Sequence, residues 1–214
     1  PMQDNNVRLE KMQNILSSIN VEVSRDEAEG VYSDYVKKEV VISNSKEISG
    51  VAAFDVELSK EVVKDPMERN APLYIAEKDG STYYIIPLRG KGLWGPIWGY
   101  ISLESNVSTI YGATFDHKSE TPGCGAEIKT PAFTDLFPGK EILDDQKSFT
   151  GIKVMKGNAS GEHEVNGISG GTITSVGVES MITDCMKSYI PYLKSNNVAV
   201  NLSEIENLVA NIEQ

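Results

Sequence analysis

The sequence predicts an α+β domain, with a largely antiparallel central sheet flanked by helices. Three observations support this fold class: helical apolar spacing near both ends, short apolar runs in the middle, and the hairpin-turn dipeptide Asp79-Gly80 between two of these runs. With 40% hydrophobic residues, the 214-residue chain can bury one substantial core. We therefore expect one compact globular unit, made of an N-terminal helical segment (1–45) and a main α+β domain (46–214).

The N-terminal segment is expected to contain two helices. From Val7 onward the apolar residues recur at helical spacing, at Leu9, Met12, Leu16 and Ile19. Ser24 then precedes an acidic turn that suits the start of a second helix, because carboxylates stabilise the positive end of the helix dipole: Asp26, Glu27 and Glu29.

The middle of the chain is expected to form the sheet. Its short apolar runs are separated by turn-forming residues and predict strands at 39–42, 51–58, 73–76, 82–88, 97–103 and 107–115. Glu104-Ser105-Asn106 connects the last two. Because consecutive strands follow one another through short connections, most of the pairing should be antiparallel.

The C-terminal half mixes loops with helices. We expect an ordered Gly- and Pro-rich loop at 119–126, a short helix at 132–136, a strand at 152–155 and a second loop at 157–171. A long helix follows, and its buried face should pack on the sheet through Val178, Met181, Ile182, Cys185 and Tyr189. Pro191 should end or kink it. A last helix at 203–212 has Ser203 as N-cap, with Glu206 completing a capping box.

Composition excludes several function classes. The net charge of −11, with no Lys/Arg cluster interleaved with aromatics, argues against a nucleic acid partner. The longest apolar runs are far shorter than a membrane span and no signal peptide is visible, so the chain as given is expected to be soluble. Its start at Pro1-Met2 fits either a processed terminus or a cut after a removed membrane anchor.

The cysteines and histidines are too few and too scattered for a metal or redox centre. Cys124 and Cys185 lie 61 positions apart and are expected to be free thiols rather than a disulfide. Only His117 and His163 are available as imidazole ligands, so no metal site is expected. No Ser/His/Asp or paired-carboxylate arrangement predicts a catalytic residue.

Gly90-Lys91-Gly92-Leu93-Trp94-Gly95 matches the dinucleotide pattern G-x-G-x-x-G by its letters alone. A dinucleotide site needs a helix directly after the glycines, because the helix N-terminus holds the pyrophosphate. Here the residues from Pro96 onward predict another strand. The glycines are therefore expected to form a turn or bulge in the sheet.

A second glycine-rich run, Asn166-Gly167-Ile168-Ser169-Gly170-Gly171-Thr172-Ile173-Thr174-Ser175, lies just before the long helix. Its glycines allow close approach of a ligand, and the free N–H groups of the helix N-terminus favour a phosphate near Thr172. Thr172, Thr174 or Ser175 can equally cap the helix without any ligand. The two interpretations are compatible.

The stretch from Asn166 to Thr172 resembles the flavinylation motif of the FMN-binding domain family, in which a threonine is joined to FMN through a phosphoester bond. The resemblance makes Thr172 the covalent anchor and implies FMN contacts from its neighbours Ser169, Gly170, Gly171, Ile173 and Thr174. Asn166 stands where the family usually has Asp, and Gly171 where it usually has Ala.

Within this family the chain is similar, over about 7–194, to the C subunits of the sodium-translocating NADH:quinone oxidoreductases. Gly90 to Trp94, Trp98 to Leu103 and Glu120 to Glu127 carry this resemblance. It implies an electron-carrying flavoprotein that belongs to a bacterial inner-membrane complex, which couples NADH oxidation and quinone reduction to sodium export. The domain would lie on the periplasmic face, anchored by an N-terminal membrane helix that this sequence lacks. Its partners would be the other proteins of the complex and, during maturation, a flavin transferase.

The resemblance also gives roles to residues outside the motif. On its own, 119–126 has the pattern of an ordinary surface loop. The resemblance places it against the flavin, with Glu120 and Thr121 as hydrogen-bond partners of the ribityl or phosphate group and Cys124 packed near the ring. Lys153 and Lys156 either offset the phosphate charge or are solvated strand lysines.

In this interpretation the flavin does the redox chemistry, while the protein supplies attachment, orientation and a local field. Thr172 is an anchor, and the isolated domain is an electron carrier with no turnover of its own. The alternatives are the G subunit of the Rnf electron-transport complex, a reversible FMN binder, and an extracytoplasmic interaction module that has lost its flavin.

Overall fold

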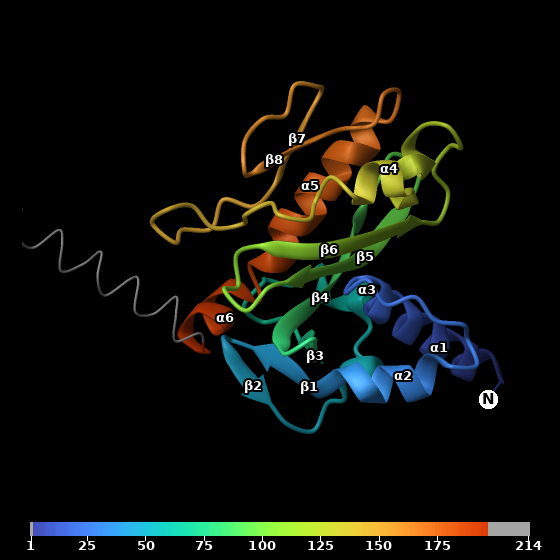
Figure 1. Cartoon of the computed structure of the whole chain (residues 1–214), viewed down its shortest axis with the longest axis vertical. Helices are drawn as coiled ribbons and strands as arrows, with labels where there is room; N and C mark the ends of the chain where they lie inside the picture. The colour runs from blue at the N-terminus through green and yellow to red at the C-terminus, as the bar shows by residue number, and fades with distance from the viewer. Residues whose placement is uncertain (1, 197–214) are drawn as a thin grey trace, which may run out of the picture.

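A six-stranded antiparallel sheet with helices on both faces forms the centre of the molecule, which confirms the predicted α+β class (Figure 1). The computed structural model describes residues 2–196. The helix expected at 203–212 lies outside the described residues. The strand order is β2-β1-β3-β4-β5-β6, and each neighbouring pair is antiparallel.

Four of the six expected strands lie within observed strands, and a fifth overlaps one. The observed bounds are β1 (Val36–Ser43), β2 (Lys46–Ile48), β3 (Ala71–Lys78), β4 (Ser81–Lys91), β5 (Pro96–Leu103) and β6 (Ile110–His117). The strand expected at 107–115 starts later, at Ile110. The Asp79-Gly80 hairpin is confirmed, because both residues have positive φ (51° and 78°) and Lys78 pairs with Ser81.

The strand expected at 51–58 is wrong. This segment forms a 3-10 turn, η1 (Ala53–Asp55), and a short helix, α3 (Leu58–Glu61). Phe54 packs edge-on against Tyr32 and Tyr74, with ring centroids 5.6 and 5.5 Å away. The Lys11 ammonium donates to the Phe54 carbonyl at 3.0 Å. Ala53 and Val56 are buried and Phe54 is half-buried by side-chain packing under a turn, not by pairing in the sheet, and Val51 remains 37% exposed.

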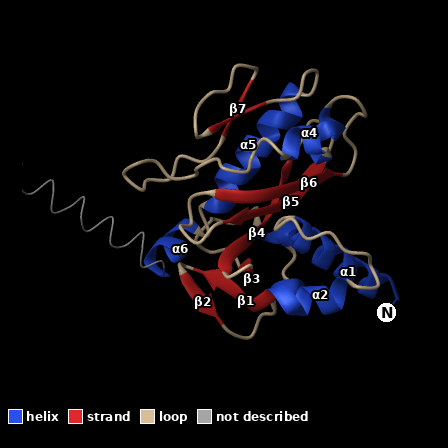
Figure 2. Cartoon of the chain, in the orientation of Figure 1, coloured by secondary structure: helices blue, strands red, loops and turns tan. Residues whose placement is uncertain are grey.

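The N-terminal helices α1 (Met2–Ser17) and α2 (Ala28–Tyr35) cover one face of the sheet (Figure 2). This core contains Met12, Ile15, Leu16 and Ile19 together with sheet residues such as Val41, Tyr74, Ile85 and Tyr100. α2 begins at Ala28, after a turn in which the Glu27 N–H donates to the Ser24 carbonyl at 3.2 Å and the Glu27 carboxylate accepts hydrogen bonds from Ser24. β1 follows α2 directly and pairs with β3, so the 1–45 segment also supplies a strand.

The opposite face of the sheet is covered by α5 (Thr172–Met186). Val178, Met181, Ile182 and Cys185 are buried, which confirms this part of the predicted helix face. Tyr189 is also buried, but it lies in the turn after α5, because the helix ends at Met186. Their core includes the sheet residues Ile86, Leu88, Ile97 and Ile101. Gly90 of β4 lies against this helix, since a methyl group there would stand 2.7 Å from Cβ of Met181.

Shorter elements complete this second layer. They are η2 (Gly125–Lys129), α4 (Pro131–Thr134), β7 (Lys153–Met155), β8 (Glu164–Asn166) and α6 (Ile190–Asn196). β7 and β8 pair in parallel, and β8 lies within the stretch expected to be a loop at 157–171. The gap between α5 and α6 is consistent with Pro191, which has no N–H to continue a helix across it. None of the described helices is long and apolar enough to cross a membrane.

The two glycines Gly30 and Gly80 should respond oppositely to replacement by alanine. Gly30 lies in α2 with no atom within 4 Å of an added Cβ, whereas Gly80 has φ +78°. We expect Gly30→Ala to raise the free energy of unfolding by about 0.5–1 kcal/mol. Gly80→Ala should lower it by about 1–2 kcal/mol, because alanine is strained at positive φ. Urea unfolding of both variants checks this, and a stabilised Gly80→Ala would contradict the observed turn.

Candidate functional site

Thr172 is the first residue of α5 and is exposed to solvent. Its hydroxyl has no hydrogen-bond partner among the residues that the structure describes. The first N–H groups of a helix have no partner within it, and the helix dipole makes this end positive. A free hydroxyl therefore stands where the backbone favours an anion.

Thr172, Thr174 and Ser175 were each expected as a possible N-cap of α5, but none of them occupies the N-cap position. The N-cap residue is Gly171, which has no side chain to cap the helix. Thr174 uses its hydroxyl on Glu120, and Ser175 donates to the Gly171 carbonyl at 2.9 Å and accepts from the Ile168 N–H at 3.0 Å. Ser175 thus closes the turn before the helix, and Thr172 remains available.

The turn before α5 packs directly on the 119–126 loop. Gly170 has φ +74°, and a methyl group there would stand 3.6 Å from Sγ of Cys124. A methyl group on Gly171 would stand 3.1 Å from the Cys124 carbonyl. Loop and motif, almost 50 positions apart in the chain, are thus brought together, with Cys124 half-buried between them.

Glu120 connects this loop to two other segments. Only 5% of Glu120 is exposed. Its carboxylate accepts hydrogen bonds from the Thr174 hydroxyl of α5 and from the Trp94 N–H of the β4–β5 turn, the latter at 2.8 Å. A methyl group on Gly92 or Gly125 would stand 2.5 or 2.6 Å from a carboxylate oxygen. The carboxylate predicted to bind a ligand therefore binds the protein's own donors.

Hydrogen bonding keeps the Glu120 carboxylate ionised. Burial raises the pKa of Glu120, but bonds from the Thr174 hydroxyl and the N–H groups of Trp94, Leu93 and Gly95 act in the opposite direction and prevail. The pKa consequently lies below its ordinary value of 4.5. The site thus contains a buried negative charge at neutral pH.

The β4–β5 turn contains Gly92 and Gly95 of the dinucleotide-like pattern and is a turn as predicted, while Gly90 is paired in β4. Gly92 N–H donates to the Gly95 carbonyl at 2.8 Å, and β5 follows at Pro96. α5 crosses this turn closely, since a methyl group on Gly177 would stand 2.5 Å from the Lys91 carbonyl oxygen. Glycine at position 177 is therefore needed for the approach of helix and turn.

A cavity of about 290 Å³ opens beside Thr172. Ser169, Gly170, Thr172 and Lys156 contribute to its wall; the others are Val154, Met155, Gly167, Ile168, Ser175 and Val176. Ligand pockets generally have volumes of roughly 300–1,000 Å³, so this cavity suits a small polar group or part of a larger ligand. Lys156 is the cation that lines it.

Large apolar side chains are exposed on the two segments that Glu120 joins. Leu93 and Trp94 in the β4–β5 turn are 44% and 64% exposed, and Ile173 and Val176 in α5 are 60% and 44% exposed. The two segments approach each other closely at Gly177, and a contiguous exposed apolar surface generally marks a place that another group covers. Sequence reasoning did not identify Leu93, Trp94 and Val176 as site residues. The available signal was two large apolar residues inside a glycine turn.

The remaining predicted residues lie around this centre. Thr121 is exposed, and its carbonyl accepts from the N–H groups of Cys124 and Ala126. Lys153, in β7, is exposed and does not line the cavity. Asn166, at the end of β8, accepts the Ala159 N–H at 2.9 Å. Cys124 and Cys185 are both free thiols, as expected.

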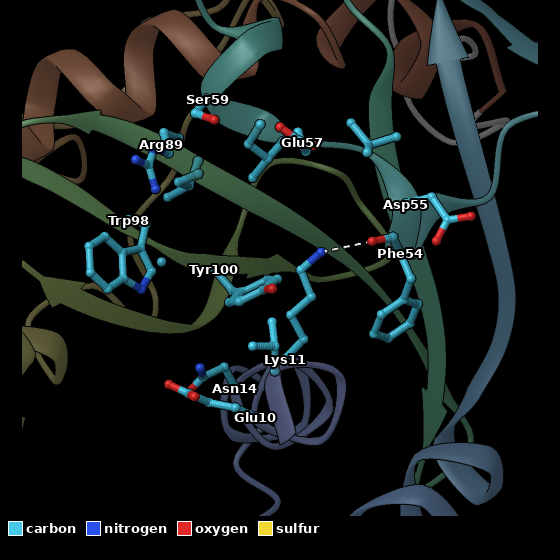
Figure 3. Close-up of a pocket in the computed structure, with 15 residues that line it drawn as sticks. Glu10, Lys11, Asn14, Phe54, Asp55, Glu57, Ser59, Arg89, Trp98 and Tyr100 are labelled. Atoms are coloured by element: carbon cyan, nitrogen blue, oxygen red, sulfur yellow. Dashed lines mark hydrogen bonds between the residues drawn. The ribbon is translucent and has the colours of Figure 1, made fainter. Parts of the chain in front are cut away.

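A separate cavity of about 370 Å³ lies between α1, the η1 segment and strands β4 and β5 (Figure 3). Figure 3 shows Lys11, Arg89, Trp98 and Tyr100 around it. It shares no residue with the cavity beside Thr172. No group of three or more His, Cys, Asp or Glu side chains suited to a metal ion occurs among the described residues.

Comparison with known proteins gives matches over the site and over the whole fold. Residues 92–187 match the sequence profile of the FMN-binding domain. This range contains the β4–β5 turn, the 119–126 loop, the glycine-rich motif and α5.

The chain is 35% identical over 121 residues to the C subunit of the Na(+)-translocating NADH-quinone reductase of Pseudomonas aeruginosa, covering 54% of this chain and 46% of the relative. It is 27% identical over 201 residues to the corresponding protein of Haemophilus ducreyi, covering 84% and 77%.

Two crystal structures resemble the fold. That of the C subunit of the Na(+)-translocating NADH-quinone reductase from Parabacteroides distasonis has a TM-score of 0.84 and 42% identity, covering 92% of this chain and 97% of that one. That of Shewanella oneidensis NqrC has a TM-score of 0.74 and 24% identity, covering 89% and 99%, and supports the fold alone.

The stability contributed by Glu120 should depend on pH. Its folded pKa is lowered, so the contribution is complete above the unfolded pKa and is lost as the pH falls through the folded value. We expect Glu120→Gln to lower the free energy of unfolding by about 1–3 kcal/mol at neutral pH, because buried donors lose their charged acceptor.

Urea unfolding of wild type and Glu120→Gln across pH measures this effect. The difference between them should shrink as the pH is lowered past 4.5, the ordinary carboxyl value. Glu127→Gln is the matched control, since the Glu127 carboxylate lies in the same region and accepts from the Gly123 N–H at 2.9 Å. A difference that stays constant with pH would show that Glu120 is not held ionised.

Proposed function

The chain belongs to the family of C subunits of the Na(+)-translocating NADH-quinone reductases, and from this membership we propose that it carries FMN on Thr172 and passes electrons through that flavin. The attachment is a phosphoester between the Thr172 hydroxyl and the FMN phosphate. The observation that carries the proposal is the exposed, unpartnered Thr172 hydroxyl at the N-terminus of α5, beside a cavity inside the FMN-binding domain match.

The residues present fit the phosphate end of FMN. Thr172 supplies the attachment oxygen, and the first N–H groups of α5 face the same region as hydrogen-bond donors. Lys156 lines the adjoining cavity and offsets phosphate charge, which matters in a chain of net charge −11. The cavity of about 290 Å³ accommodates the ribityl and phosphate groups, with Ser169 as a polar wall residue.

The isoalloxazine ring, in this proposal, covers the exposed apolar side chains of Leu93, Trp94, Ile173 and Val176. The ring is too large to share the small cavity with the rest of the molecule, and these residues provide an apolar surface beside it. Cys124 packs at the edge of the ring, while Thr121 contacts the ribityl group from the exposed side of the loop. Lys153 remains a solvated lysine.

FMN supplies the electron-transfer chemistry when it is bound, and no residue of this chain needs to act as a catalytic acid, base or nucleophile. The chain's role is to fix the flavin, to shield one side of it and to set the field around it. Covalent attachment keeps the cofactor at a high effective concentration in a domain that exchanges electrons with several partners.

The wider setting is part of the same proposal, and the names of the relatives support its sodium-translocating and NADH-quinone reductase parts. The chain serves within a membrane complex that couples NADH oxidation and quinone reduction to sodium export, with this domain on the periplasmic face of the bacterial inner membrane. Its partners are the other proteins of that complex and the flavin transferase that forms the ester. The match covers 46% of the length of the Pseudomonas aeruginosa relative and 77% of the length of the Haemophilus ducreyi relative.

Asn166 stands where the family usually has aspartate, at the end of β8. Its side-chain oxygen accepts the Ala159 N–H, a role that a carboxylate fills equally well. Gly171 replaces the usual alanine at a position where a methyl group would stand 3.1 Å from the 119–126 loop backbone. Asn166 therefore fits the same turn, whereas an alanine at 171 requires the 119–126 loop to lie a few tenths of an ångström farther away than it does here.

Intact-mass spectrometry tests the attachment directly. Protein produced together with a flavin transferase should gain the mass of FMN less one water, and Thr172→Ala should gain nothing because the attachment oxygen is missing. Ser180→Ala, which removes another exposed hydroxyl from the same helix, should be labelled like the wild type.

Two results would contradict covalent attachment at Thr172. The first is a wild-type protein without the mass increment under these conditions. The second is an increment that persists in Thr172→Ala. A yellow wild-type protein that loses its colour on denaturation would instead support reversible FMN binding.

A further inference from the structure

Glu120 differs from the other buried carboxylate of the described chain in having no cationic partner. Glu61 is 8% exposed and lies 2.9 Å from the Lys64 ammonium, so its charge is neutralised locally. Glu120 is 5% exposed, and no lysine, arginine or histidine forms an ion pair with it among the described residues. Among the described residues, the groups that bind its carboxylate are uncharged hydrogen-bond donors.

The position of Glu120 is fixed on all sides. The Thr174 hydroxyl and the Trp94 N–H bind its carboxylate, and Gly92 and Gly125 pack so closely that any side chain there would collide with it. At the start of the loop, the Glu120 N–H donates to Nδ1 of His117 at 3.2 Å. The carboxylate therefore has one location relative to α5.

That location is close to the anchor proposed for the flavin. Thr174, which binds the carboxylate, follows Thr172 by two residues in the first turn of α5; its side chain is buried, whereas that of Thr172 is exposed. Trp94, bound through its N–H, belongs to the exposed apolar surface proposed to meet the ring. The negative charge thus lies between the two parts of the protein that hold FMN.

We infer that Glu120 is a positioning residue, which fixes the 119–126 loop and the β4–β5 turn around the flavin. We further infer that the negative charge of Glu120 makes the flavin harder to reduce. Both statements rest on the proposed function. Electron uptake increases the negative charge on the flavin. A fixed carboxylate opposes this increase by Coulomb repulsion, which is strong where burial limits screening by solvent. Dipoles from neutral donors stabilise the carboxylate without cancelling its field at the flavin.

The test is a redox titration of flavin-loaded Glu120→Gln and wild type. Gln has nearly the same shape and keeps an acceptor for the Trp94 N–H, but it carries no charge. We expect a more positive midpoint potential in Glu120→Gln. Glu127→Gln removes a partly exposed carboxylate from the same region and should shift the potential less, because solvent screens that charge. Glu120→Asp keeps the charge and should stay nearer the wild-type potential than Glu120→Gln.

Thr174→Val supplies a second test if Glu120→Gln does not fold. It removes a hydrogen bond that keeps Glu120 ionised, so the carboxylate should take up a proton at higher pH than in the wild type. The midpoint potential of Thr174→Val should then rise more steeply than that of wild type as the pH is lowered from about 7 to about 5. His117, which accepts the Glu120 N–H, is present in both proteins, so the comparison changes only the Thr174 hydrogen bond to Glu120.

The outcomes separate this inference from the proposed function. A wild type that carries no flavin on Thr172 overturns both. Flavin-loaded Glu120→Gln with the wild-type potential overturns the inference alone, as does Thr174→Val with the wild-type pH slope. A positive shift in Glu120→Gln that exceeds the shift in Glu127→Gln supports it.

Discussion

The hydrogen bond between the Thr174 hydroxyl and the buried Glu120 carboxylate links the sheet, the loop and the helix that make up the site. The same carboxylate binds the β4–β5 turn, so three segments between residues 92 and 174 depend on a single charged group. Because so little of Glu120 is exposed, water cannot replace a partner that is lost. Three glycines make this close packing possible. A side chain at Gly92 or Gly125 would collide with the Glu120 carboxylate, and one at Gly177 would collide with the Lys91 carbonyl.

The rest of the fold brings these three segments to one place. The β4–β5 hairpin is aligned by long antiparallel pairing from Tyr84↔Leu103 to Lys91↔Pro96. The apolar face of α5 packs on the same strands, so the N-terminus of α5 lies beside the end of the hairpin. α1 and α2 cover the opposite face and take no part in the site, which leaves the flavin-binding chemistry to the second layer.

Local patterns predicted the regular parts of this arrangement well. Short apolar runs and the Asp79-Gly80 turn identified the central strands, and helical spacing identified the buried face of α5. The segment 51–58 was misassigned because its apolar residues suit a strand equally well, and only packing of Phe54 between Tyr32 and Tyr74 decides for a turn. β2 and β8 were missed because each has only three residues. For the site, the residues alone indicated an anion-binding helix terminus at Thr172, and the flavin came from the family resemblance. The partners of Glu120 depend on contacts between residues more than 20 positions apart, which no local pattern contains.

The most direct test of a flavin on Thr172 is a crystal structure of the protein after treatment with flavin transferase. The account predicts continuous electron density from the Thr172 hydroxyl oxygen to the FMN phosphate, the ribityl chain in the adjoining cavity, and the ring against Leu93 and Trp94. Density for FMN in the separate cavity between α1 and β5, or an ester on a different hydroxyl, would contradict it.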